Sequence, residues 1–456
     1  MRRFPILQPR SPTERSGDAE DASHEDLEAQ LQLILFVFPV PGTRAVVMAK
    51  TKTPRGLRKA INQMARLNIP LDPAKTGRDA ASLESNLRRM IVGQDEAIQQ
   101  IVNIYQMNLT GMSAPRRPIG NFLFLGPTGS GKTRIVEATA ETLLKNPRAV
   151  IKIDCAEFQH SHEIAKLIGS PPGYLGHRET HPLLSQEVLN QDHTDTIKLS
   201  FVLFDEIEKA SDAVWNLLLG IMDKATLTLG DNRKVDFSRA MIFMTSNLGA
   251  SEMSTLIRPR LGFHAAVARE NTANGTVDGD MGGKLARSGI EAARRKFTPE
   301  FMNRLDKIVT FQPLGSAELK KILEIELNLL QQRLFNMSHG RGFVFTVSDS
   351  GKDFLLGEGT DLKYGARHLK RAIERLLVQP MANLIATDQA RGGDWIRVDY
   401  DDSAHALRFA REAEGLRVED MAQLVDTLVT NAAFTNGRTA ETPRTQAAKI
   451  SKRTSS

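Results

Sequence analysis

GPTGSGKT, residues 126–133, is the stretch that decides how this sequence folds. It fits the pattern Gly-x-x-x-x-Gly-Lys-[Ser/Thr] at every fixed position, and the apolar run Asn121–Leu125 (NFLFL) precedes it. Glycines let consecutive backbone N–H groups turn toward a phosphate, and a helix that begins near Thr133 would direct its positive end at the same anion. A strand, a phosphate loop and a helix in this order predict a site for a nucleoside triphosphate.

Two residues of this phosphate loop have predicted roles of their own. We expect the Lys132 ammonium to contact the β- and γ-phosphates and the Thr133 hydroxyl to hold Mg²⁺. The remaining residues of the predicted ATP cradle are Gly126, Pro127, Thr128, Gly129, Ser130 and Gly131. The alternative is a flexible glycine turn without a ligand, which the preceding strand and the following helical pattern disfavour.

The composition is typical of a soluble globular protein of two or three domains. The chain has 456 residues, of which 41% are hydrophobic and 25% charged, with a net charge of +6. Cys155 is the only cysteine, which excludes an internal disulfide and favours a small buried side chain. The longest apolar run, Leu33–Val40, contains Pro39 and is too short to span a bilayer. We therefore expect a cytoplasmic protein without a membrane partner.

Strand-like segments alternate with helical patterns after the phosphate loop, at residues 150–154, 201–204 and 241–244. This alternation predicts an α/β fold in which helices flank a parallel sheet. The predicted organisation is an N-terminal extension (1–81, largely disordered or helical), a large domain (82–312), a small α+β domain (313–412) and a helix with a disordered basic tail (413–456). Residues 264–290, rich in Gly, Ala, Asn and Asp, are predicted to form a mobile insertion.

Acidic and amide side chains follow two of these strands. Asp205 and Glu206 end the run LFDE, so Asp205 can complete the Mg²⁺ shell and Glu206 can polarise the attacking water. Asn247, at the end of the next strand, would orient that water, although an Asn at a strand end is more often a turn former or cap. Acids at a strand end are a weak signal alone, and the phosphate loop makes the catalytic interpretation the stronger one.

Six ordered segments carry a resemblance to a known family: PRRPIGNFLFLGPTGSGKT (115–133), LIGSPPGYLGH (167–177), LFDEIEKA (203–210), VDFSRAMIFMTSNLGA (235–250), FTPEFMNRLDKIVTFQPL (297–314) and YGARHLKRAIERL (364–376). Over residues 82–412 the chain resembles the second ATPase module of the Clp family of AAA+ unfoldases. The resemblance implies an AAA+ P-loop NTPase sheet followed by a Clp-type small domain. The family's amino-terminal domain, first ATPase ring and coiled-coil middle domain find no counterpart, which implies a single-ring form.

The resemblance implies further nucleotide contacts. IVGQDEAI (91–98) is similar to the family segment that packs near the adenine, which implicates Ile91 and Val92. Arg304 matches the arginine finger, which reaches the γ-phosphate of a neighbouring subunit, and Arg367 matches the second sensor arginine. A site shared in this way implies a homo-oligomer, with six subunits expected. Without the resemblance, each arginine would be read as a surface ion-pair partner.

Two loops resemble contact sites for other proteins. Gly173, Tyr174, Leu175 and Gly176 match the family's pore loop, which grips unfolded polypeptides, although the following residues 177–182 depart from the usual acidic, glycine-rich continuation. Leu261, Gly262 and Phe263 are similar to the tripeptide with which ClpC and ClpA dock onto the ClpP peptidase. Packing within the loop is an equally good interpretation of these three residues.

The leading functional hypothesis is an ATP-driven unfoldase or remodelling chaperone that threads polypeptides through a ring pore. One alternative is an ATPase subunit that delivers substrates to a ClpP-like peptidase. An alternative of another class is a nucleic-acid-associated AAA+ motor, which the scarcity of basic residues beside Tyr174 disfavours. A regulatory scaffold without turnover would lack Lys132, Glu206 or Arg304, and all three are present.

Overall fold

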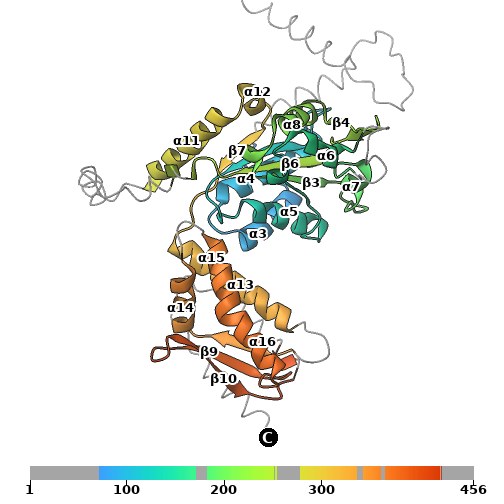
Figure 1. The fold of residues 1–456 in the computed structure, drawn as a ribbon. Helices are drawn as coiled ribbons and strands as arrows, with labels where there is room; N and C mark the ends of the chain where they lie inside the picture. The colour runs from blue at the N-terminus through green and yellow to red at the C-terminus, as the bar shows by residue number, and fades with distance from the viewer. Residues whose placement is uncertain are drawn as a thin grey trace, which may run out of the picture. The chain divides into compact units, whose positions relative to one another are not determined.

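In the computed structural model, the described residues are 71–170, 182–250, 252–253, 278–335, 342–360, 365–417, 419–421 and 423 (Figure 1). The chain divides into Met1–Ala74 and Lys75–Ser456, and every helix and strand named below belongs to the second unit. Within the described ranges, no helix is both long and apolar enough to cross a membrane.

A parallel sheet of five strands forms the centre of the large domain. Its strands are β1 (Gly120–Leu125), β2 (Ile151–Asp154), β3 (Ser200–Asp205), β6 (Ala240–Ser246) and β7 (Lys307–Thr310), in the spatial order β2-β3-β6-β1-β7. Every neighbouring pair is parallel, which confirms the predicted parallel sheet. β7, at one edge, and the antiparallel pair β4 (Thr226–Thr228) and β5 (Lys234–Asp236) were not among the expected strands.

Alternate residues of each strand face opposite layers of helices. In β1, Phe122 and Phe124 join the core beneath α3 (Arg78–Met90), α4 (Asp95–Leu109) and α5 (Lys132–Leu144), whereas Leu123 and Leu125 join the core of the other face. That second core includes residues of α8 (Asp212–Lys224), α11 (Asp278–Lys296) and α12 (Pro299–Met302) (Figure 1). Strand residues buried on both sides explain why the strands read as continuous apolar runs.

Short helical segments connect the strands of the sheet. They are η1 (Cys155–Glu157), η2 (Ser161–Ile164), α6 (Ala165–Ile168), α7 (Gln186–Asn190) and η3 (Ile207–Lys209). Cys155 is fully buried, as expected, and burial raises the pKa of its thiol. Its neutral sulfhydryl therefore acts as a small apolar core group.

The predicted mobile insertion at 264–290 is wrong for its second half, because α11 begins at Asp278. Gly289 of this segment serves helix packing. A Cβ on Gly249 would lie 2.8 Å from the Cα of Gly289, so both residues must be small for α11 to approach the loop after β6. Leu285 and Ala293 are buried on the same helix. Residues 264–277 lie outside the described residues.

The small domain is α+β, as predicted. The long helix α13 (Ser316–Phe335) buries the predicted leucine stripe: Leu319, Leu323, Leu327, Leu330 and Leu334. β8 (Val344–Val347), β9 (Trp395–Asp401) and β10 (Ala406–Ala413) form a sheet in the order β10-β9-β8. The remaining elements are α14 (Asp349–Gly359), α15 (Ala366–Ile373), the π-helical turn η4 (Glu374–Val378) and α16 (Gln379–Ala386).

Candidate functional site

The phosphate loop lies between β1 and α5, at the carboxyl edge of the parallel sheet. Three of its glycines have positive φ values: 148° at Gly126, 79° at Gly129 and 101° at Gly131. A Cβ on Gly126 would lie 2.7 Å from the carbonyl oxygen of Phe311, so backbone crowding also requires glycine there. Ligands of open parallel sheets bind at this edge, where a loop leads into a helix N-terminus.

Lys132, the first residue of α5, is folded back over the loop. Its side chain is buried, and Nζ donates to the carbonyl oxygens of Gly126 (2.7 Å) and Pro127 (2.9 Å) and to Oδ1 of Asn247 (3.0 Å). Burial lowers the pKa of Lys132 to about 8, against the opposing influence of the Asp205 carboxylate. The ammonium is therefore already desolvated, which strengthens its attraction to an incoming phosphate.

Asp205 and Glu206 stand at the end of β3, beside the loop. Thr133 Oγ1 donates to Asp205 Oδ2 at 3.5 Å, and Thr245 Oγ1 donates to Asp205 Oδ1. Glu206 adopts a left-handed backbone conformation with a φ of 55°, and its N–H donates to Thr245 Oγ1 at 3.1 Å. Such backbone strain in a residue other than glycine persists where the surroundings enforce it, and it is common at functional sites.

Asn247 connects the lysine to the second acid. Its Nδ2 donates to Glu206 Oε1 at 3.1 Å, while its Oδ1 accepts from Lys132. The other Glu206 oxygen pairs with the ammonium of Lys209. The structure thus brings Lys132, Glu206 and Asn247 into one chain of hydrogen bonds. These residues were expected from the sequence to share a site, and their catalytic roles stay predictions.

Glu208 is a third acid in this cluster, and the sequence analysis did not select it. Its Oε1 accepts from the backbone N–H of Asn247 at 3.0 Å, and its Oε2 is buried without a hydrogen-bond partner. The only available signal was its place two residues after Glu206 in the segment LFDEIEKA. Glu208 thus holds the Asn247 backbone through Oε1, while its partnerless Oε2 carries a desolvation cost.

The residues expected near the adenine lie on a segment between α3 and α4. Ile91 is buried and Val92 is partly buried, and the following Gln94 donates to the carbonyl oxygen of Ser130 in the phosphate loop at 3.1 Å. In the small domain, the N–H of Ala366 donates to the carbonyl oxygen of Gly129 at 3.3 Å, and the neighbouring Arg367 is exposed. The Arg367 charge contributes to the lowered pKa of Lys132.

Arg304 follows α12, and its guanidinium is not paired with the phosphate loop of its own chain. It forms ion pairs with Asp223, at the end of α8, and with Glu300. Its backbone carbonyl oxygen accepts from Arg117 Nη2 and Asn121 Nδ2, both at 3.4 Å. Two carboxylates and two donors therefore position this arginine.

Two predicted loops lie outside the described ranges of the chain. Gly173, Tyr174, Leu175 and Gly176 lie outside the described residues, as do Leu261, Gly262 and Phe263. Their proposed roles in substrate gripping and peptidase docking stay predictions.

The donor atoms present fit a magnesium nucleotide. Mg²⁺ prefers oxygen ligands and usually combines one or two carboxylates with substrate phosphates and water. Thr133 Oγ1 and Asp205 Oδ2 lie 3.5 Å apart and offer a hydroxyl and a carboxylate oxygen. Among the described residues, no group of three or more His, Cys, Asp or Glu side chains could hold a metal ion without a substrate.

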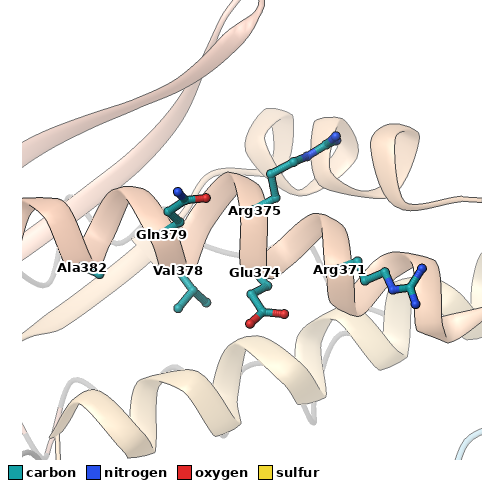
Figure 2. Close-up of a pocket in the computed structure, with 6 residues that line it drawn as sticks. All are labelled: Arg371, Glu374, Arg375, Val378, Gln379 and Ala382. Atoms are coloured by element: carbon teal, nitrogen blue, oxygen red, sulfur yellow. The ribbon is translucent and has the colours of Figure 1, made fainter.

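A separate pocket lies on the small domain. It has a volume of about 550 Å³ and is lined by Arg371, Glu374, Arg375, Val378, Gln379 and Ala382, which follow one another along α15, η4 and α16 (Figure 2). None of the predicted nucleotide-binding residues lines it.

Comparisons with known proteins agree with this geometry. Residues 117–308 match the family model of the AAA domain (Cdc48 subfamily), and residues 314–398 match the C-terminal, D2-small domain of ClpB protein. Chaperone protein ClpB of Pseudomonas putida is 38% identical over 303 residues, which are 66% of this chain and 32% of that protein. The ATP-dependent Clp protease ATP-binding subunit ClpC of Staphylococcus aureus is 34% identical over 341 residues, 75% of this chain and 39% of that protein.

A solved structure of a related protein is also similar to this chain. An Hsp104 chain, from a closed-state cryo-EM reconstruction with ATPγS and FITC casein, matches 73% of this chain and 52% of its own length, with a TM-score of 0.58 and 28% identity. The chain spans only 32% and 39% of the lengths of the two curated relatives. Through its large and small domains, the chain belongs to the Clp family of AAA+ ATPases.

Proposed function

We propose that this chain is an ATP-hydrolysing unfoldase or remodelling chaperone that threads polypeptides through the pore of a ring. The observation that carries the proposal is the hydrogen-bonded chain of Lys132, Asn247 and Glu206 beside the carboxylate of Asp205. It combines a phosphate-binding cation, a metal-binding carboxylate and a general base at one sheet edge, which is the set that hydrolysis of a nucleotide requires.

In the proposed reaction, the loop N–H groups and Lys132 bind the ATP phosphates. Thr133 and Asp205 would hold Mg²⁺, which would offset charge on the phosphates. Glu206 accepts the proton of the attacking water, and Asn247, which donates to Glu206 Oε1, orients both groups. Ile91 and Val92 would contact the adenine.

We propose that the site is completed by a second copy of the chain. Arg304 would reach the γ-phosphate held by a neighbour, in a homo-oligomer of six subunits, and stabilise the charge that develops during transfer. Arg367 would contact the phosphates from the small domain of the same chain and couple hydrolysis to domain movement. An isolated subunit would then hydrolyse ATP poorly.

The substrates we propose are unfolded or tagged proteins, gripped by the loop that carries Tyr174 and moved by successive rounds of hydrolysis in the cytoplasm. The second candidate function is delivery to a ClpP-like peptidase through Leu261–Phe263. The name of the Staphylococcus aureus relative, a protease ATP-binding subunit, favours this candidate. Co-purification with a peptidase, lost when residues 261–263 are deleted, would support delivery, and persistent binding after the deletion would contradict this docking site.

The decisive experiment on the ATPase is Glu206→Gln in the full chain. We expect ATP binding and assembly to persist while turnover falls by about 100-fold or more, because general-base catalysis contributes roughly 10²–10⁴-fold. Glu187→Gln is the matched control, since Glu187 is exposed and pairs with Arg233 on the surface. Turnover that is unchanged in Glu206→Gln would overturn the proposed site.

A further inference from the structure

Gln94 is a buried amide whose three hydrogen bonds join segments far apart in the sequence. Its side chain is only 4% exposed. Nε2 donates to the carbonyl oxygen of Ser130 at 3.1 Å and to that of Gln312 at 2.9 Å, and Oε1 accepts from the N–H of Gln312 at 3.1 Å. One side chain thus contacts the phosphate loop and the backbone that leads from β7 into α13.

The position of Gln94 makes these bonds informative. It is the N-cap residue of α4, yet its side chain makes no capping hydrogen bond to the helix. A polar N-cap side chain ordinarily satisfies one of the free N–H groups of its own helix. Gln94 instead satisfies the Gln312 N–H and the carbonyl oxygens of Ser130 and Gln312. Its side chain therefore joins the phosphate loop to the segment after β7 rather than capping its own helix.

The segment it reaches is the connection between the two domains. Gln312 follows Phe311, whose N–H donates to the carbonyl oxygen of Leu125 at 2.7 Å, directly before the phosphate loop. Three residues after Gln312, the N–H of Gly315 donates to Glu318 at the start of α13. Gln94 therefore links the loop backbone at Ser130 to this connection through a single side chain.

We propose that Gln94 is a positioning residue that relays the nucleotide state of the phosphate loop to the hinge at residues 311–315. The inference rests on the proposed ATP site. Its physical basis is that a fully bonded buried amide has one favoured arrangement, so a shift of the Ser130 carbonyl must shift Gln312 or leave a buried polar group unsatisfied.

The test measures amide hydrogen exchange in the full chain, in Gln94→Leu, and in the control Gln99→Leu. The Gln99 side chain bonds only to Asn103 within α4. Without nucleotide, Gln94→Leu should accelerate exchange of the Gln312 amide by about tenfold or more, because its acceptor is gone. Unchanged exchange of the Gln312 amide would overturn the proposed role of the Gln94 side chain, whether or not the protein binds ATP.

The second arm adds a slowly hydrolysed ATP analogue at saturation. In the wild type and in Gln99→Leu, we expect protection of the phosphate loop and of residues 311–319. In Gln94→Leu, we expect the loop to be protected while residues 311–319 lose about nine-tenths of the added protection. Full protection of residues 311–319 in that variant would overturn the relay. Failure of the wild type to bind the analogue would instead overturn the proposed ATP site.

Gln94→Glu keeps the test decisive where Gln94→Leu fails to fold. A carboxylate still accepts from the Gln312 N–H but no longer donates to the carbonyl oxygens of Ser130 and Gln312. We expect normal protection of the Gln312 amide without nucleotide and loss of the nucleotide-dependent protection at residues 311–319. Retention of that nucleotide-dependent protection in Gln94→Glu would contradict the proposal.

Discussion

Arg304 is held by Asp223 of the same chain, in an ion pair that joins the end of α12 to the end of α8. Glu300 contacts the same guanidinium, with 3.1 Å between Arg304 Nη2 and Glu300 Oε1. The arginine is thereby kept in one orientation and partly dehydrated, with its side chain 23% exposed. A guanidinium that is preorganised in this way loses less entropy when it meets a phosphate.

We expect Arg304→Ala to lower ATP turnover by about 10³-fold, with little change in ATP affinity. The reason is that an arginine finger stabilises the transition state of the ATP bound to the neighbouring subunit. Asp223→Asn should lower turnover only about three- to fivefold, the effect of one partly exposed ion pair. Mixing Arg304→Ala subunits with Glu206→Gln subunits should restore part of the activity, because each contributes the group that the other lacks. Mixed rings without recovered turnover would contradict action across the interface.

The lowered pKa of Lys132 predicts that ATP affinity depends on pH. Below about pH 8 the ammonium is charged in the nucleotide-free protein, and above it the charge is progressively lost. Since bound phosphate favours the charged form, binding takes up a proton above pH 8, and the Kd should rise by up to about tenfold per pH unit. Titration of a fluorescent ATP analogue between pH 7 and 9.5 measures this slope.

Lys132→Met is the control for this slope, because it should bind weakly with a Kd that does not change with pH in this range. Unfolding does not explain the slope: between pH 8 and the usual lysine value of 10.5, the unfolded chain binds more protons than the folded one. The contribution of Lys132 to stability therefore rises with pH in that window. A wild-type Kd that stays constant up to pH 9.5 would show that Lys132 remains charged.

The local pattern around the phosphate loop was sufficient to predict β1, α5 and the acids that end β3, because each depends on neighbours in the sequence. β7 was missed because its four residues begin with Lys307 and carry too weak a strand pattern. α11 was taken for part of a mobile insertion because its glycines resemble a loop until Gly249 is seen beside Gly289. Gln94 could not be selected, since its partner Gln312 lies 218 residues away.

Glu208 should affect turnover through Asn247 rather than through ATP binding. Glu208→Gln keeps an acceptor for the Asn247 N–H, so we expect turnover within about threefold of the wild type. Glu208→Ala leaves that N–H without its partner and should lower turnover by about tenfold, the effect of one buried hydrogen bond. Steady-state kinetics separate kcat from KM. Equal losses of turnover in Glu208→Gln and Glu208→Ala would show that the charge matters more than the hydrogen bond, because both variants remove the carboxylate.

Trp215 links the turn after Glu206 to the element that carries Arg304. Its Nε1 donates to the carbonyl oxygen of Ile207 at 3.1 Å. Its ring packs edge-on against Phe297, with centroids 5.5 Å apart, and tilted against Phe301 at 6.5 Å. The carbonyl oxygen of Phe301 in turn accepts from the N–H of Arg304 at 3.1 Å.

Trp215→Phe should therefore retain most of the ring packing, lower stability by about 1 kcal/mol through the lost N–H bond, and reduce kcat several-fold at unchanged KM. Trp395→Phe is a matched control, because its Nε1 also makes one side-chain hydrogen bond, to Thr346 Oγ1 at 3.3 Å, but within the small domain. Denaturation followed by circular dichroism measures the stability of both variants, and ATPase kinetics measure their turnover. Equal losses of kcat in the two variants would mean that Trp215 contributes packing alone, since Trp215, unlike Trp395, contacts both the turn after Glu206 and Phe301 of α12.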